Sequence, residues 1–353
     1  MSIYTVATYP KSEDCLKLSI VVPVYNEEQN IIRCLNSILK QTLGPNAIDL
    51  VIVFASCEDN TLSLINDWAA ENSSKFWSIR LVHNGKKTLA AGWNLGVKYS
   101  RSELVILTSG HFFMNPDYSE ILTSLMVIHQ DIFTIGGNIT ADTSQKPMCL
   151  FSRIFKQIYQ TRSLVGNANY RVSQDKDTNA LDYDCDTACF GCYRRHTFLT
   201  IKGFNEDLLR SQDFELHCRL RKLGLRQARS TFALGEYRLR IHPLDAYKYA
   251  YINGFWISRP LTKYPYMFRL RHSIPFLFHI TLLFSLGLLF ITPLASIPLA
   301  FLLLSYTGYL LSGFRNLNIT DAPVGIILAF LYHNIYAIGY SHGLLISLVK
   351  GRL

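Results

Sequence analysis

A short polar turn lies where sheet proteins commonly bind ligands. Residues Leu104–Leu107 form a wholly apolar run of strand length, and the sequence Thr-Ser-Gly-His follows it at residues 108–111. In open α/β sheets, ligands bind in the crevice beyond the carboxyl ends of the strands. The hydroxyl of Ser109 and the imidazole of His111 are therefore candidates for ligand contact. The alternative is an ordinary turn, in which Ser109 bonds to nearby backbone and His111 has no ligand.

The segments that must position this turn alternate between strand and helix patterns. Apolar runs typical of buried strands cover residues 18–26, 48–56, 78–83 and 103–109. Segments with helical patterns cover residues 31–39, 61–68 and 89–100. Asp59 or Thr61 is a candidate cap for the second of these helices. Strands that alternate with helices predict an α/β fold with a mostly parallel, doubly wound sheet.

The last part of the chain is far more apolar. Residues 273–314 contain no Lys, Arg, Asp or Glu, and neither do residues 322–349. A helix that crosses a bilayer needs about 20 mostly apolar residues. The first stretch is therefore long enough for two spans divided near Pro293, and the second stretch is long enough for one. Buried core helices are the alternative, but the length of the runs favours about three transmembrane spans within residues 273–353.

Aromatic and basic residues precede the apolar region. Residues 241–272 contain Lys248, Lys263, Arg269 and Arg271 among many tyrosines, phenylalanines and a tryptophan. This mixture is typical of a membrane interface that faces the cytoplasm, so the net charge of +9 does not require nucleic acid as a partner. Residues 1–240 are then expected to form a cytoplasmic domain.

Other sequence patterns limit the possible classes of protein. The eight cysteines lack the spacing of a metal site, and Cys185–Cys192 is expected to stay reduced, as in a cytosolic domain. The first residues have no apolar core after a basic start, so no signal peptide is expected. The Rossmann GxGxxG and the P-loop GxxxxGK[ST] are both absent. Any nucleotide must therefore be held without a glycine-rich phosphate loop.

Four longer motifs together resemble one enzyme family. They are IVVPVYNEEQNIIRCLNSILKQT, DNT, HNGKKTLAAGWNLGVKYSRSELVIL and GFNEDLLRSQDFELHCRLRKLG, in this order. With them the chain resembles the family 2 inverting glycosyltransferases, which have the GT-A fold. FGCYRR, TSGH and FRLRHSIP are similar to motifs of the membrane-linked transferases of succinoglycan-type exopolysaccharide synthesis. The resemblance covers roughly residues 18–275.

The resemblance implies a membrane-anchored, multi-pass glycosyltransferase with its catalytic domain on the cytoplasmic side. It would transfer a sugar from a nucleotide sugar, a UDP-sugar by family analogy, to a lipid-linked sugar or polysaccharide acceptor. Exopolysaccharide or cell-surface glycan synthesis is the implied process. A catalytically silent homologue with a binding or assembly role is the alternative. A transporter is disfavoured because the soluble domain dominates the chain.

Sugar transfer needs a base for the acceptor hydroxyl, a stabiliser for the departing diphosphate and a grip on the nucleobase. The resemblance assigns the base to Asp213 in SQDFEL, where Gln212 replaces the acid that usually precedes it. An aspartate that only caps the helix running to Leu223 would stand at the same place. Glu215 is a second candidate for the base, but two residues further into a helix it faces elsewhere.

The resemblance also assigns residues to the nucleotide-sugar donor. They are Pro23, Tyr25 and Glu27 in the first turn, Asp59 in the second, Lys87 beside Lys86 in the third, and Ser109, Gly110 and His111. Tyr25 would cover the base with its ring, and a lysine would pair with the diphosphate. Solvent-exposed turns are the plainer explanation of the same positions. The acid that usually ends the second strand is absent, because Phe54 and Ala55 stand there.

The DxD motif of the family is replaced by Ser109-Gly110-His111. A divalent metal, Mn²⁺ or Mg²⁺, is implied by the family, and such hard cations prefer oxygen ligands. Loss of the first carboxylate weakens a site for Mg²⁺, whereas the neutral imidazole of His111 still suits Mn²⁺. Alternatively no metal is needed, and His111 stabilises the leaving group together with Lys87 or with Arg194 and Arg195.

Overall fold

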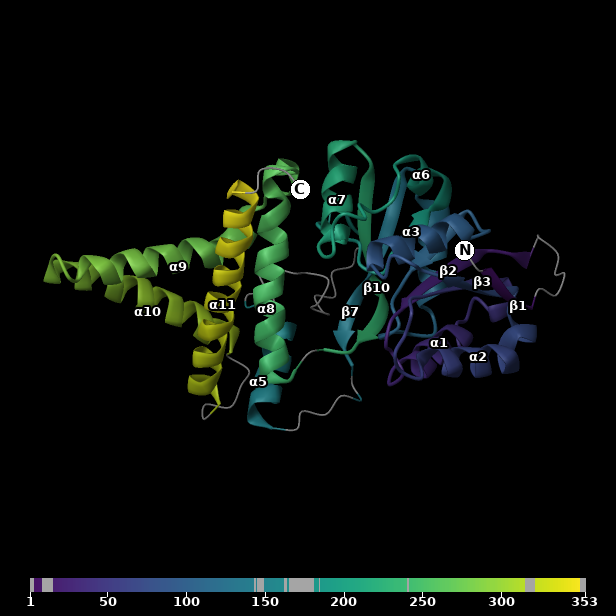
Figure 1. Ribbon diagram of the computed structural model, residues 1–353, viewed down its shortest axis with the longest axis horizontal. Coiled ribbons are helices and arrows are strands. Elements are labelled where there is room, and N and C mark those ends of the chain that lie inside the picture. Colours follow the sequence, from purple (N-terminus) through teal and green to yellow (C-terminus); the bar gives the residue numbers. More distant parts are fainter. Residues whose placement is uncertain are drawn as a thin grey trace. The chain divides into compact units, whose positions relative to one another are not determined.

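The computed structural model describes residues 3–7, 15–142, 144, 149–161, 164, 181–183, 185–239, 241–314 and 321–349. The chain divides into two compact units (Figure 1). The first comprises Met1–Asp142 and Ser173–Arg238, and the second comprises Thr143–Val172 and Leu239–Leu353. The second unit therefore takes one of its segments from the middle of the chain.

The first unit is built on one mixed sheet, which has ten strands within the described residues. The strands are β1 (Ile3–Ala7), β2 (Leu18–Val24), β3 (Ile48–Phe54), β4 (Ser78–His83), β5 (Leu104–Leu107), β6 (Phe112–Met114), β7 (Ile132–Ala141), β8 (Leu181–Tyr183), β9 (Cys192–Arg194) and β10 (Arg226–Tyr237). Their order across the sheet is β1-β4-β3-β2-β5-β9-β7-β10-β6, and β8 pairs with β10.

The parallel core predicted from the sequence is confirmed for β2 to β5. Strand β2 pairs in parallel with β3 and with β5, and β3 pairs in parallel with β4. The remainder of the sheet is mixed, because β9 runs antiparallel to β5 and β7, while β7 and β10 are parallel. The short strands β1, β6 and β8 pair antiparallel with longer neighbours.

Helices cover both faces of the parallel core, which explains why every residue of β2 and β3 is buried. The helices of this unit are α1 (Ile31–Leu39), α2 (Thr61–Asn72), α3 (Leu89–Tyr99), α4 (Tyr118–Ile128), α6 (Arg195–Thr200) and α7 (Gln212–Lys222). Figure 1 shows α1 and α2 on one face of the sheet and α3 on the other. Helix α3 lies very close to β2, since a Cβ at Gly96 would come 2.1 Å from Val21 Cγ1.

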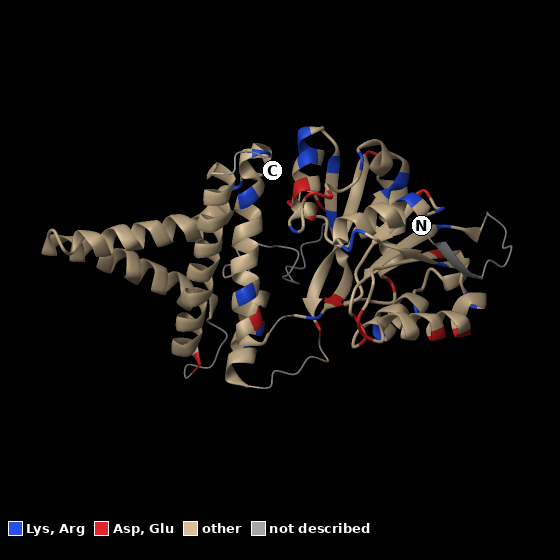
Figure 2. Cartoon of the chain, viewed as in Figure 1, with Lys and Arg blue, Asp and Glu red and all other residues tan. Residues whose placement is uncertain are grey.

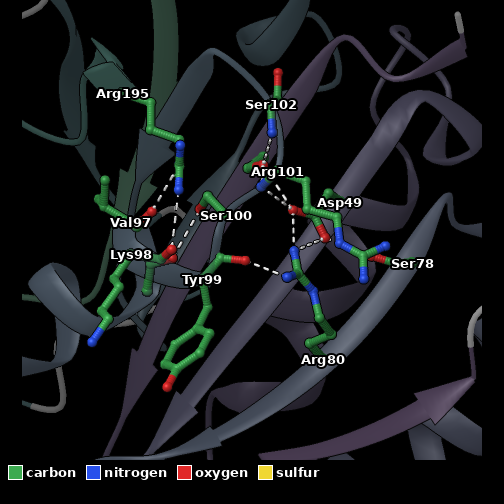
Figure 3. Close-up of polar contacts among 12 residues, drawn as sticks. Asp49, Ser78, Arg80, Val97, Lys98, Tyr99, Ser100, Arg101, Ser102 and Arg195 are labelled. Atoms are coloured by element: carbon green, nitrogen blue, oxygen red, sulfur yellow. Dashed lines mark hydrogen bonds and ion pairs between the residues drawn. The ribbon is translucent and has the colours of Figure 1, made fainter. Parts of the chain in front are cut away.

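A buried ion pair ties the amino ends of the core strands together (Figure 3). Asp49 in β3 is fully buried and is paired with Arg80 in β4. Its carboxylate also accepts hydrogen bonds from Ser19 Oγ in β2 at 2.8 Å and from Ser78 Oγ at 2.5 Å. The backbone N–H of Arg101, just before β5, donates to the same carboxylate at 3.0 Å. One buried charge thus links four neighbouring strands.

We expect Asp49→Asn to lower the free energy of unfolding by about 3–5 kcal/mol, because it leaves the buried guanidinium of Arg80 without its counter-charge. Chemical unfolding of the purified protein measures this change. Asp67→Asn, which removes a carboxylate from an exposed position of α2, is the matched control and should change stability little. Equal stability of the two variants would contradict a dominant role for the buried pair.

The second unit is helical in the residues that the structure describes. Its helices are α5 (Leu150–Gln160), α8 (Pro243–Ser258), α9 (Leu270–Leu288), α10 (Ser296–Gly313) and α11 (Ala322–Val349). Ile154, Phe155 and Ile158 of α5 are buried in a hydrophobic cluster with residues of α8, α10 and α11. The segment from the middle of the chain therefore supplies part of this core.

Glycines let α8 and α11 pack backbone to backbone. A Cβ at Gly339 would come 2.1 Å from the carbonyl oxygen of Tyr251, and one at Gly254 would come 2.1 Å from that of Tyr336. Ser258 Oγ bridges the helices by donating to the carbonyl of Tyr340 at 2.7 Å. Small residues at such a contact allow close approach with good van der Waals packing.

Two helices in the described part of the chain are long and apolar enough to cross a membrane. They are Pro293–Gly313, which includes α10, and Ala322–Val349, which is α11. The remaining predicted span corresponds to α9, which has 19 residues but includes Arg271, His272 and His279. Its crossing of a membrane stays a prediction. Figure 2 shows the ribbon of α9 and α10 almost wholly in the colour of residues other than Lys, Arg, Asp and Glu.

Candidate functional site

The ends of β2 and β5 meet at the point where the strand order reverses. Strand β2 has β3 on one side and β5 on the other. The chain continues from β2 to β3 on one side, whereas β5 lies on the other side, and such a switch point is where open α/β sheets bind ligands. Tyr25 and Glu27 follow β2, while Ser109 and His111 follow β5. The fold thus brings together two of the loops singled out from the sequence.

His111 is fixed through both ring nitrogens. Its Nδ1 lies 2.5 Å from Oε1 of Glu27, and its Nε2 lies 3.0 Å from the hydroxyl of Tyr237. Gly110 makes this possible, because a Cβ there would come 2.9 Å from Cγ of Glu27. Tyr237 was not predicted from the sequence. It arrives from the end of β10, which β6 joins by pairing Phe112 with Tyr237.

Ser109 lies differently from His111. Its side chain is buried, and in the described structure its Oγ has no hydrogen-bond partner. Its carbonyl oxygen accepts a bond from the thiol of Cys34. A buried hydroxyl is poorly placed to replace a carboxylate that would face a phosphate or a metal ion. Ser109 therefore shapes the turn, while His111 supplies its accessible polar group.

The loop after β2 and the loop after β3 are bound to each other by hydrogen bonds. Glu27 N–H donates to Thr61 Oγ1 at 2.7 Å, and Glu28 N–H donates to Asp59 Oδ2 at 3.1 Å. Asp59 Oδ1 also accepts from Thr61 N–H at 3.0 Å, close to the start of α2. Desolvation raises the pKa of Asp59, but these hydrogen bonds together lower it below its usual value. Asp59 thus orders the strand-end loops that carry Tyr25 and Glu27.

Pro23 and Tyr25 have contrasting positions. Pro23 is buried within β2 beside α3, where a Cβ at Gly92 would come 3.0 Å from its own Cβ. Tyr25 lies just beyond the strand and is 46% exposed. An exposed ring at a strand end is suited to cover a planar base, whereas a buried proline can only support the loop.

The two lysines after β4 are not equivalent. Lys86 Nζ pairs with Glu206 Oε2 at 2.7 Å, and this contact raises the pKa of Lys86. Glu206 also accepts a bond from Asn94, so Lys86 ties its turn to the GFNED loop. Lys87 is exposed and has a left-handed backbone, with φ of 54°. Lys87 is therefore the better candidate for pairing with a diphosphate.

Asp213 stands at the start of α7, directly after an unusual backbone turn. Ser211 has φ of 60° and ψ of 17°, a left-handed conformation that is uncommon for residues other than glycine. Asp213 is partly exposed, and its Oδ1 accepts a bond from Phe214 N–H at 2.8 Å. Glu215 is buried and bound to Arg219 at 2.9 Å, so it is a poor candidate for the base. Asp213 therefore lies in the first turn of α7, where its carboxylate accepts a backbone N–H, and it is also exposed enough to meet a substrate.

A buried histidine connects the start of α7 with strand β9 and with the loop before that strand. His217 Nδ1 donates to the carbonyl of Asp213 at 2.6 Å. Its Nε2 must then be an acceptor, and it lies 3.3 Å from Ala188 N–H and 3.2 Å from Tyr193 OH. Phe190, two residues beyond Ala188, stacks on Tyr237 with centroids 6.0 Å apart. His217 was not singled out from the sequence, although its spacing of four from Asp213 places both on one helical face.

His217 makes the stability of the folded protein depend on pH in a predictable way. Burial lowers its pKa to about 4, whereas an unfolded histidine titrates near 6.5. As pH falls through about 6.5, the unfolded state takes up a proton that the folded state cannot. The stabilising contribution is therefore full above about pH 6.5 and lost towards pH 4. Between pH 7 and pH 5 we expect a loss of about 2 kcal/mol through this residue.

Chemical unfolding at the two pH values measures the effect. His217→Gln keeps a hydrogen-bonding side chain but cannot titrate, so its stability should depend less on pH than that of the parent. An identical pH dependence in both proteins would show that other groups account for it.

The hypothesis that Arg194 and Arg195 stabilise a leaving group is wrong. In antiparallel register, Arg194 pairs with Leu104, the first residue of β5, at the end opposite His111. Its guanidinium donates to the carbonyls of Ile132, Met126 and His129. Arg195 donates to the carbonyls of Val97 and Lys98, as Figure 3 shows. Both arginines bind carbonyls near helix ends, a common use of the residue.

The residues at this edge do not fit a divalent metal ion. Within the described part of the chain, no group of three or more His, Cys, Asp or Glu side chains is placed to hold one. A metal at His111 would have to displace Glu27 from Nδ1 or Tyr237 from Nε2. The hydroxyl of Ser109 is buried, so it does not supply the oxygen ligand that the family motif places there.

Comparison with known proteins agrees with this geometry. A profile of the family described as glycosyl transferase family 2 matches residues 19–195, half of the chain. The chain belongs to glycosyl transferase family 2. The match includes β2 to β5 and the loops that hold Tyr25, Asp59, Lys87 and His111. This membership establishes an enzyme of the glycosyltransferase type, as predicted from the motifs.

Individual relatives extend the similarity beyond the family match. A dolichyl N-acetyl-alpha-D-glucosaminyl phosphate 3-beta-D-2,3-diacetamido-2,3-dideoxy-beta-D-glucuronosyltransferase of Methanococcus voltae is 23% identical over 93% of this chain and 97% of its own length. The O-antigen chain rhamnosyltransferase RfbN of Salmonella typhimurium is 20% identical over 69% of this chain and 75% of its own. The similarity to the first of these includes the apolar region.

The fold has a counterpart among solved structures. A mannosyltransferase from Pyrobaculum calidifontis, determined with GDP-Man and Mn²⁺, superposes with a TM-score of 0.55. The two chains are 14% identical, and the superposition covers 95% of this chain and 88% of the other. The predicted α/β, GT-A-like fold followed by apolar helices is thereby confirmed.

Proposed function

We propose that this family 2 enzyme is a membrane-anchored, inverting glycosyltransferase. It uses a nucleotide sugar as donor and a lipid-linked sugar or polysaccharide as acceptor, in exopolysaccharide or cell-surface glycan synthesis. The main support for the proposal is a chain of contacts that connects Asp213, the candidate base, with the loops at the strand ends. His217 binds the carbonyl of Asp213 on one side and Ala188 on the other. Phe190 in the same segment stacks on Tyr237, which in turn holds His111.

The proposed chemistry divides between Asp213 and the strand-end loops. The carboxylate of Asp213 accepts the proton of an acceptor hydroxyl, whose oxygen forms a bond to the anomeric carbon of the donor sugar. The bond from that carbon to the diphosphate breaks, and the diphosphate leaves with the electron pair. Attack from the side opposite the leaving group inverts the anomeric centre. Lys87 pairs with the diphosphate and Tyr25 covers the base, for which uracil is proposed from the family.

The acceptor is proposed from chemistry shared with the relatives. The Methanococcus voltae relative carries a dolichyl phosphate sugar in its name, and its similarity runs along almost the whole chain. An acceptor with a lipid tail requires an enzyme at a membrane. The apolar region supplies this, because residues such as Phe290 and Phe301 are 94% and 75% exposed. Exposed apolar surface of this kind is suited to lipid.

The turn between α9 and α10 is also suited to lipid. Phe290 N–H donates to the carbonyl of Gly287, while Ile291 and Thr292 N–H groups donate to that of Leu288. Leu294 N–H donates to Thr292 Oγ1, and Pro293 has no N–H to satisfy. Within a bilayer, backbone donors must be satisfied by the protein itself. This turn satisfies them without a charged residue.

Asp213→Asn tests the catalytic assignment. We expect sugar transfer to fall by about 10²–10⁴, because the base is lost, while donor binding stays near that of the parent. The measurement is transfer from a panel of UDP- and GDP-sugars to lipid-linked acceptors, with donor affinity by calorimetry. Asp207→Asn, in the neighbouring exposed loop, is the matched control and should retain activity. Full activity of Asp213→Asn would remove this residue from the mechanism.

Membrane attachment is tested by fractionation. We expect the protein to remain in the membrane pellet after a carbonate wash, because exposed apolar helices stay in lipid. Replacing Phe301 and Leu304, exposed residues in the middle of α10, with aspartate should release a larger fraction, since a charge near the bilayer centre costs about 2.5–3.5 kcal/mol. The same change at Val127 and Ile128, exposed residues of α4, is the control. Release of the parent protein by carbonate alone would contradict insertion.

A further inference from the structure

We infer that Tyr237 and Arg238, at the end of β10, bind the donor diphosphate in the place of a metal ion. The inference rests on the proposed function, because it concerns how that donor is held. Neither residue belongs to a motif that pointed to the site. Both lie beyond residues 19–195, the part of the chain matched by the family.

Strand pairing brings the end of β10 to the donor loops. Tyr237 pairs with Phe112 of β6 and with Ala141 of β7. The next residue, Arg238, donates its backbone N–H to the carbonyl of His111 at 3.3 Å. The backbone of residues 237 and 238 therefore runs directly beside the turn that carries His111.

The phenol of Tyr237 is held in a defined direction. Its ring packs edge-on against the imidazole of His111, with centroids 4.9 Å apart, and stacks on Phe190. Glu27 fixes the opposite side of the imidazole, and its second oxygen accepts a bond from Asn30 Nδ2 at 2.9 Å. With Nδ1 donating to this carboxylate, Nε2 faces the phenol. A hydroxyl hydrogen rotates about its C–O bond, so it can turn from Nε2 to a phosphate oxygen.

Arg238 supplies the positive charge that a metal would otherwise bring. Its side chain is exposed, and its Nη1 contacts Asn30 Oδ1 at the long distance of 3.4 Å. Asn30 also binds Glu27, so the guanidinium lies beside the Glu27–His111–Tyr237 array. A guanidinium offers two parallel N–H donors, which suit phosphate oxygens better than a single point charge.

The chain offers a matched control at the other end of the same strand. Arg226 is the first residue of β10, exposed and paired with Asp131. Arg226→Gln removes the same charge from the protein as Arg238→Gln but leaves the site untouched. Tyr183→Phe in β8, which pairs with the amino half of β10, is the control for Tyr237→Phe.

Calorimetry with UDP, UMP and GDP, first in EDTA and then with Mn²⁺, tests the inference on the full-length protein. We expect the parent to bind UDP more tightly than UMP and equally well with or without Mn²⁺. Arg238→Gln should weaken UDP binding about 10-fold or more, since bonds to charged groups are among the strongest. UMP binding should change little, because the second phosphate is the group recognised.

Tyr237→Phe should lower sugar transfer about 10-fold with little change in the thermal unfolding temperature, because both ring contacts are kept and the partly exposed Nε2 of His111 can bond to water in place of the hydroxyl. If Mn²⁺ is required for UDP binding, or if the variants behave like their controls, the inference is wrong while the proposed function stands. If the parent binds no nucleotide and transfers no sugar, the proposed function fails and this inference fails with it.

Discussion

The buried charge of Asp49 is the constraint on which the arrangement of the site depends. A carboxylate without water must be paired and hydrogen-bonded, and here its partners come from β2, β4 and the turn before β5. These contacts fix the amino ends of the strands in one register. Because β2 and β3 pair residue by residue from Leu18 with Ile48 to Val24 with Phe54, their carboxyl ends also finish level. The donor loops begin at that edge.

Cross-loop hydrogen bonds then give these loops a shared geometry. Asp59 and Thr61 bind the backbone after β2, and Lys86 binds the loop that leads towards Asp213 through Glu206. Several acidic and basic side chains of the family motifs therefore bond to other parts of the protein. The exposed side chains of Tyr25 and Lys87 have no such role within these loops and are the better candidates to face a substrate. Side chains that bond within the protein can thus be separated from those that could contact a substrate. This leaves fewer candidate donor-binding residues than the motifs alone suggest.

Local sequence patterns were sufficient to predict the parallel core of the sheet. They were insufficient to predict the residues that β9 and β10 bring to the site or keep away from it. Apolar runs predicted β2 to β5, since burial on both faces leaves a signal within each strand. The position of Tyr237 depends on β6 crossing to pair with β10, a contact between residues more than 120 apart. The arginines after Cys192 looked suitable for a diphosphate, but the antiparallel direction of β9 places them at the opposite edge. No periodicity in the sequence reports such long-range pairing.

The exchange of the family's DxD for Ser-Gly-His has consequences for several residues at once. A metal site needs ligands with free lone pairs, whereas His111 has both nitrogens committed to Glu27 and Tyr237. Once the imidazole is held in this way, the glycine before it must leave room for Glu27, and the serine can be buried. We propose that the charge for the diphosphate then comes from side chains such as Lys87 and Arg238. In this proposal the loss of one carboxylate is one part of a coupled change, in which hydrogen bonds and arginine replace coordination.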